Sequence, residues 1–183
     1  MVAVRAKLSS EVTLASEVLV WTWRFYLRHI GVIVGLSLLP GIQRLVVVTW
    51  QEEIPSGVSM ASEVAVGAVR LVLLALIVRW AFDGVETSWA QAGRFLRKHP
   101  MSLLFHLGLL GAGFVIFDLL TEKLVGAAVP ESARDGYLGV LLIVKNPTVI
   151  ALASVWLVGV VMQALSGGSA PRARRSERGI AAR

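Results

Sequence analysis

Charged residues interrupt the apolar stretches of this 183-residue chain, and three of them are its best candidates for binding chemistry. They are Arg44, Arg70 and Asp118. A charge at the centre of a membrane helix costs roughly 2.5–3.5 kcal/mol on insertion scales, so such residues usually have a partner or a ligand. The planar guanidinium of arginine matches the oxygens of a phosphate. We therefore expect Arg44 and Arg70, with Lys145 at the edge of the last apolar stretch, to bind a lipid phosphate or another anion.

A structural interpretation of the same residues competes with the binding site. Asp118 can form an ion pair with one of the two arginines and hold two helices in register. The other arginine can then extend its guanidinium to the membrane surface, as long basic side chains do. The sequence leaves both interpretations open.

Catalysis and metal binding receive little support. The chain has no cysteine, and it contains no HExxH, GxSxG or GxxxxGK[ST] pattern and no paired carboxylates. His106 is the only histidine inside an apolar stretch. Metal sites need several convergent ligands, so we expect His106 to pack among its neighbours, with metal binding as the weaker alternative. We predict no enzyme and no cofactor.

The elements that must position these residues are long apolar helices. Hydrophobic residues make up 56% of the chain and charged residues 16%, whereas globular domains average about 25% charged. A transmembrane helix needs roughly 20 mostly apolar residues. We predict an all-α integral membrane protein with four transmembrane helices, over residues 29–50, 64–82, 101–120 and 147–165.

A repeated pattern precedes the first and third of these helices. Residues 24–41 read RFYLRHIGVIVGLSLLPG and residues 94–111 read RFLRKHPMSLLFHLGLLG, with an offset of 70. Polar residues at helical spacing predict an amphipathic interfacial helix within residues 1–28 and another over 86–99. Each half is then an interfacial helix followed by two spans, whether or not the halves arose by duplication. The bases expected to contact lipid headgroups are Arg24, Arg28, Arg94, Arg97 and Lys98.

The basic residues also predict an orientation. Lysine and arginine flank the start of the first span, the connection between the second and third, and the end of the fourth. The positive-inside rule then places both termini in the cytoplasm, in an inner membrane. Residues 29–166 form the membrane domain, and residues 167–183 are expected to be a basic disordered tail. The net charge of +6 predicts contact with anionic lipids, and no nucleic acid is expected.

Small residues allow close contact between membrane helices. Gly31, Gly35, Gly108 and Gly111 are the candidates, facing either another helix of this chain or a partner, and we favour the first. The leading functional hypothesis is a non-catalytic accessory, structural or assembly subunit of a larger membrane complex, with other subunits or further copies of itself as partners. The alternative is a small transport or lipid-handling protein with an outer-leaflet site built from the arginines and Asp118. A membrane enzyme acting on lipid-linked substrates ranks last.

Overall fold

The computed structural model describes residues 2–50 and 53–168, and within these residues the protein is entirely helical. Nearly all of the predicted basic tail, from residue 169 onwards, lies outside the described residues. The elements in chain order are α1 (Val2–Arg28), α2 (Ile30–Thr49), α3 (Ser56–Ala81), α4 (Trp89–Lys98), α5 (Pro100–Phe114), the π-helix η1 (Val115–Val125), α6 (Gly126–Ala128), α7 (Glu131–Lys145), the π-helix η2 (Asn146–Ile150) and α8 (Ala151–Leu165).

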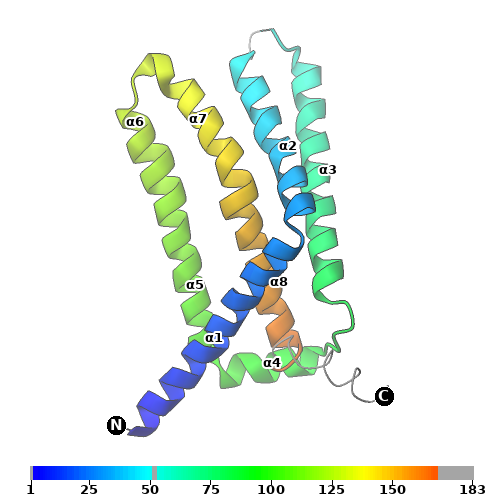
Figure 1. Cartoon of the computed structure of the whole chain (residues 1–183), viewed down its shortest axis with the longest axis vertical. Coiled ribbons are helices and arrows are strands. Elements are labelled where there is room, and N and C mark those ends of the chain that lie inside the picture. Colours follow the sequence, from blue (N-terminus) through cyan, green and yellow to red (C-terminus); the bar gives the residue numbers. More distant parts are fainter. Residues whose placement is uncertain (1, 51–52, 169–183) are drawn as a thin grey trace.

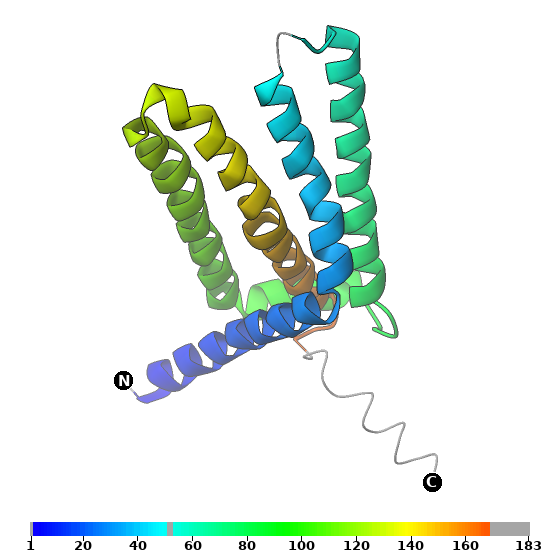
Figure 2. The ribbon, with the colours of Figure 1, turned by 45° about the horizontal axis from the view of Figure 1, so that its top comes forward.

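Two tall hairpins stand on a base made by α1 and α4 (Figure 1). One hairpin is α2 with α3. In the other, α5, η1 and α6 rise from the base, and α7, η2 and α8 return to it. Figure 2 shows α1 running obliquely out of the base, so that its N-terminal turns extend away from the hairpins.

The prediction of an all-helical protein with four apolar helices of membrane-spanning length is confirmed. The four stretches are Ile30–Val47, Ser56–Ala81, Pro100–Phe117 and Glu131–Leu165. Two of them are longer than the sequence analysis expected. Residues 121–146, predicted to be a connection between spans, are almost wholly helical, with a turn only at Val129 and Pro130. Charged residues here end the apolar window, but Glu, Lys and Arg are good helix formers, so the backbone stays helical.

Pro147 lies inside the returning helix without ending it. The surrounding residues, Asn146–Ile150, adopt a π-helix. Proline has no N–H to donate within a helix, and a local π-helical turn accommodates the lost hydrogen bond. The phenol of Tyr26, near the end of α1, donates to the carbonyl of Pro147 at 2.7 Å. Burial raises the pKa of Tyr26, which keeps the phenol a neutral donor.

The apolar core lies where α1, α2, α3 and α8 meet. Ile33, Ile77 and Val155 are fully buried there. Gly159 lets α8 approach α1 so closely that a Cβ at this position would lie 2.6 Å from the ring of Trp21. In the most apolar part of Glu131–Leu165, half of the residues are buried within the chain. The corresponding share is 6% in Ser56–Ala81 and 11% in Pro100–Phe117. The chain therefore packs around α8 and leaves most of α3 and α5 exposed.

Candidate functional site

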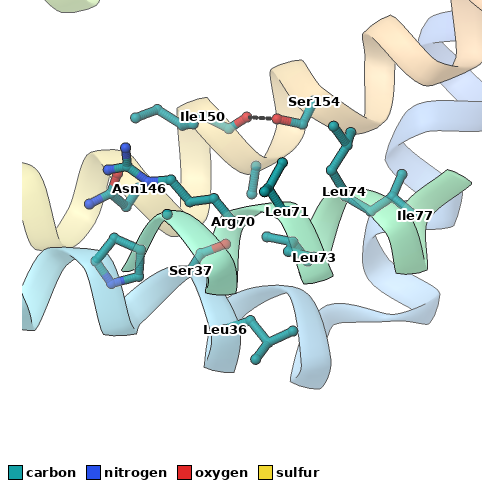
Figure 3. A pocket seen from close by; sticks show the side chains of 13 residues that line it. Leu36, Ser37, Arg70, Leu71, Leu73, Leu74, Ile77, Asn146, Ile150 and Ser154 are labelled. Atoms are coloured by element: carbon teal, nitrogen blue, oxygen red, sulfur yellow. Dashed lines mark hydrogen bonds between the residues drawn. The ribbon is translucent and has the colours of Figure 1, made fainter. Parts of the chain in front are cut away.

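A groove of about 480 Å³ opens between α2, α3 and the η2–α8 segment (Figure 3). Arg70 of α3 is the one charged residue among the thirteen that line this groove, which we call the Arg70 groove. Its polar neighbours are Ser37, Asn146 and Ser154. The remaining walls are apolar and come mainly from Leu36, Pro40, Leu71, Leu73, Leu74, Ile77 and Ile150. A single cation thus lies in a mostly apolar groove that also contains three polar side chains.

The pairing of α2 with α3 places the residues of the groove opposite one another. Gln43 Nε2 donates to Ser62 Oγ at 2.9 Å, and Ser62 Oγ donates to the Ser59 carbonyl at 2.7 Å. Because the two helices are antiparallel, Pro40 then faces the part of α3 that carries Gly67 and Arg70. A Cβ added to Gly67 would meet no atom within 4 Å, so this side of the groove is open.

The predicted anion-binding residues are not all brought together. Arg70 lines the groove, whereas Arg44 and Lys145 are not among its lining residues. Arg44 follows Gln43, whose partner Ser62 lies two turns before Arg70 on α3, a separation of about 12 Å along the helix axis. The two arginines therefore lie at different depths.

The position of Asp118 bears on the predicted ion pair. Its backbone belongs to η1, which packs against α6 and α7, whereas Arg44 and Arg70 belong to α2 and α3. The side chain of Asp118 lies outside the part of the chain whose side chains are described. Its pairing with an arginine therefore stays a prediction.

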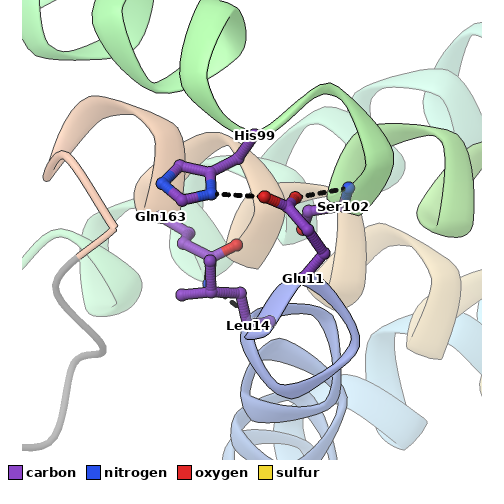
Figure 4. Close-up of polar contacts among 5 residues, drawn as sticks. All are labelled: Glu11, Leu14, His99, Ser102 and Gln163. Carbon is purple, nitrogen blue, oxygen red and sulfur yellow. Dashed lines mark hydrogen bonds and ion pairs between the residues drawn. The ribbon is translucent and has the colours of Figure 1, made fainter. Parts of the chain in front are cut away.

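A second polar site ties α1 to the start of α5 (Figure 4). The Glu11 carboxylate, in a residue only 3% exposed, accepts hydrogen bonds from His99 Nδ1 at 2.8 Å and from the Ser102 backbone N–H at 3.0 Å. Ser102 is the third residue of α5, and Pro100 at the first position has no N–H. Glu11 therefore supplies from another helix the acceptor that an N-cap side chain normally provides. We call Glu11, His99 and Ser102 the Glu11 junction.

Gln163 adds a bond between α8 and α1 beside this junction. Its Nε2 donates to the Leu14 carbonyl at 2.9 Å, one turn of α1 beyond Glu11. Gln163 Oε1 and Ser102 Oγ are buried without a hydrogen-bond partner among the described residues. The base of the protein thus joins α1, α5 and α8 through buried polar side chains.

His106 is held by an aromatic partner. The indole Nε1–H of Trp156 donates to His106 Nδ1 at 3.0 Å. An indole nitrogen can only donate, so Nδ1 must be the acceptor and the ring proton of neutral His106 is on Nε2. Among the described residues, no group of three or more His, Asp or Glu side chains is placed to hold a metal ion.

Comparison of this chain with protein-family models, curated proteins and solved structures finds no match. The features that bear on its function are therefore the Arg70 groove, the Glu11 junction and the exposed helix surfaces.

The five predicted headgroup-contacting bases are exposed and all lie on α1 and α4. They are Arg24, Arg28, Arg94, Arg97 and Lys98. Helix α4 buries Ala92 and Phe95 against Ala164 at the end of α8, and it leaves Trp89 84% exposed. This arrangement is typical of a helix lying along a membrane surface, with its bases and tryptophan outward.

The four predicted packing glycines do not contact a neighbouring helix of this chain. A Cβ added to Gly31, Gly35, Gly108 or Gly111 would meet no atom within 4 Å. Close approach occurs at other glycines, including Gly41 beside Ile143 and Gly159 beside Trp21. The glycines that the sequence selected face outward, because a GxxxG spacing identifies one face of a helix but not what covers it.

Sequence analysis overlooked Glu11. Thr13 and Glu17, polar residues of the amphipathic helix predicted within residues 1–28, are exposed and half-buried, respectively. Glu11 belongs instead to the stripe of Ala15, Val18 and Thr22, which is buried. Its three- and four-residue spacing from these small and apolar residues could have indicated a buried carboxylate.

Proposed function

We propose that this protein is a non-catalytic accessory or assembly subunit of a larger membrane complex, acting through helix–helix and lipid contacts. The observation that carries the proposal is the uneven burial of its apolar helices. Only 6% of the apolar window of α3 is buried within the chain. Val58, Met60, Val64 and Leu71 are between 58% and 70% exposed along this helix.

The internal contacts support the same proposal. Glu11, His106 and Gln163 are buried and bind other parts of the chain. These polar side chains hold the fold together and are not presented to a substrate. Function then depends on the outer surfaces of the helices.

The outward-facing glycines offer a suitable surface for a partner helix. Membrane helices associate through close van der Waals packing, which small residues permit. Gly31 and Gly35 lie one turn apart on α2 with open space above them. A helix of another subunit could approach the backbone there.

Purification in a mild detergent, followed by mass spectrometry of whatever comes with the protein, tests the proposal. We expect dissimilar subunits in fixed stoichiometry. A Gly35→Leu variant should lose them while keeping its own thermal stability, because a side chain there meets no internal atom. Gly93→Leu, at an equally open position on α4 and outside the apolar helices, is the matched control. A lone, monodisperse homo-oligomer would contradict the accessory role.

We also propose that both termini are cytoplasmic. The chain has no cysteine, so single cysteines can be introduced without background labelling. Asp83 and Ser132 are exposed near opposite ends of the spans. In intact cells a membrane-impermeant thiol reagent should label Ser132→Cys and not Asp83→Cys, and the reverse result would overturn the orientation.

A further inference from the structure

We propose that the Arg70 groove binds an acidic phospholipid of the surrounding membrane, with the lipid phosphate on Arg70 and an acyl chain along the apolar wall. The first reason is the position of Arg70, which lies near the middle of α3, between its ends at Ser56 and Ala81. A cation at this depth needs an anionic partner. Within the described chain, no hydrogen bond or ion pair to Arg70 is present.

The shape of the groove gives the second reason. The Arg70 side chain extends along the groove toward Asn146 (Figure 3). Arginine and the asparagine amide both offer N–H donors, and a guanidinium binds phosphate oxygens in a planar fork. Leu73, Leu74 and Ile77 continue the wall on the other side of Arg70. The groove therefore has one polar end and one apolar end, as an amphiphile does.

The direction of the groove matches a lipid that enters from the side opposite α1 and α4. Arg70 lies near the middle of α3, with Gly67 about one turn closer to Ser56 and Ile77 two turns closer to Ala81, where α3 meets the base. Its side chain is directed toward Asn146, which lies beside Gly41 of α2. In the leaflet on that side, a phospholipid has its headgroup outward and its acyl chains toward the membrane centre. Its phosphate meets the Arg70 guanidinium where that side chain extends toward Asn146, while a chain follows the wall toward Ile77.

A lipid fits this site better than a soluble anion. Leu71 and Leu74, on the same helix as Arg70, are 69% and 44% exposed and would face hydrocarbon. A soluble anion would have to cross hydrocarbon to reach this cation, whereas a lipid supplies both charge and hydrocarbon. The proposal is independent of the accessory role, because a lipid can occupy the groove with or without a partner subunit.

The test uses the full chain purified in mild detergent, with native mass spectrometry and thermal melting during titration with phosphatidylglycerol or phosphatidylcholine. We expect phosphatidylglycerol to bind and to raise the melting temperature, and phosphatidylcholine to do neither. Arg70→Gln should weaken phosphatidylglycerol binding about tenfold or more, the effect of losing one charge-assisted contact. Arg79→Gln is the matched control, because Arg79 is exposed in the last turn of the same helix and does not line the groove.

A second variant keeps the test valid if Arg70→Gln fails to fold. Gly67→Leu places a side chain into open space in the groove, so it should block the lipid without straining the fold. Gly57→Leu, on the same helix outside the groove, should bind lipid as the original protein does. Equal binding of both phospholipids, or unchanged phosphatidylglycerol binding in Arg70→Gln or Gly67→Leu, would overturn the proposal.

Two further measurements distinguish a bound lipid from other occupants of the Arg70 groove. Inorganic phosphate alone should not raise the melting temperature; an effect equal to that of phosphatidylglycerol would mean a soluble-anion site and overturn the lipid proposal. The oligomeric state should be the same in Arg70→Gln and the original protein. A change in oligomer size with unchanged lipid content would mean that a second copy covers the groove, which also overturns it.

Discussion

The junctions at His29 and His99 share a sequence pattern and a local geometry, yet they have different tertiary roles. Each histidine separates a helix at the base from an apolar helix. The backbone N–H of each histidine donates to the carbonyl of the preceding phenylalanine one turn earlier, Phe25 or Phe95, at 3.2 and 2.8 Å. The Phe–His ring centroids are 4.5 and 5.0 Å apart, with interplanar angles of 41° and 37°.

The imidazoles differ in what they bind. His29 Nδ1 bonds the Phe25 carbonyl of its own helix at 3.0 Å, and its ring stacks on Trp80 with centroids 4.5 Å apart. His99 Nδ1 bonds the Glu11 carboxylate, 88 residues away in the sequence. The first junction is thus completed by local and apolar contacts, and the second by a buried acid that also caps α5.

The difference teaches that a repeated pattern determines where a helix breaks, but not what stabilises the break. Glu11 has no counterpart in the second half, because Ala81 stands at the equivalent position of the repeated pattern. Helix α1 has 27 residues and crosses the base to reach α5, whereas α4 has 10 and stays beside α8. The Glu11 junction is a feature of one half only.

Loss of Glu11 should have the largest effect on stability. In Glu11→Ala, α5 loses its cap and His99 loses its acceptor, so we expect the free energy of unfolding to fall by about 2–3 kcal/mol. Denaturant titration in detergent micelles, followed by tryptophan fluorescence, measures this change. Glu17→Ala, half-buried on the same helix, is the control and should stay within about 0.5 kcal/mol. Equal losses in both variants would show that the junction contributes nothing specific.

Replacing each histidine tests the comparison directly. His99→Ala should cost about 2 kcal/mol, because it removes a charge-assisted hydrogen bond from a buried carboxylate. His29→Ala should cost about 1 kcal/mol, mainly from the lost stacking on Trp80. The same titrations measure both values. In the double variant Glu11→Ala/His99→Ala, the two losses should be less than additive by about 1 kcal/mol or more. Additive losses would mean that the two side chains do not interact.

A buried contact inside the second half should have a smaller effect. Leu36 stands at the position of the first half that is equivalent to His106, so the first half has no counterpart of the Trp156–His106 bond. Trp156→Phe removes the indole donor and should lower the free energy of unfolding by about 1 kcal/mol. Trp89→Phe, at a highly exposed position, is the control for fluorescence and melting measurements. A larger loss of stability in Trp89→Phe than in Trp156→Phe would contradict a stabilising role for the Trp156–His106 hydrogen bond.

The exposed bases at the two junctions should matter least for folding. Arg28→Gln and Lys98→Gln occupy equivalent positions, and each should change the free energy of unfolding by less than about 0.5 kcal/mol. Both should reduce binding of the protein in neutral-lipid nanodiscs to anionic vesicles, and added salt should abolish the difference. A loss of stability above about 1 kcal/mol, beyond the range usual for surface substitutions, would show that these bases make internal contacts.

Much of the architecture could be predicted from hydropathy alone. The four apolar helices and the two helices at the base follow from residue types at regular spacing, because a backbone in hydrocarbon must form its own hydrogen bonds. The helix between Thr121 and Asn146 could not be predicted in this way. Its charges interrupt the apolar run, and the chain turns at Val129 and Pro130, where Tyr137 Oη donates to the Thr121 carbonyl at 2.8 Å across the turn.

The candidate site was predicted only in part. Arg70 could be selected because a charge inside an apolar run is costly. Its separation from Arg44 depends on the pairing of Gln43 with Ser62, and its neighbour Asn146 comes from a helix much later in the chain. Such distances arise from packing between helices, on which the pattern within one helix carries no information.

The sequence by itself determined the class of protein, the apolar helices and the positions at which the chain breaks beside His29 and His99. These follow from interactions between residues close together in the chain and from the cost of exposing backbone to lipid. Only the tertiary structure decided that Glu11 caps α5, that Gly31 and Gly35 face outward, and that Arg70 stands in a groove without Arg44. Those outcomes depend on which faces of separate helices meet, because a side chain's role depends on neighbours that the helical pattern does not specify.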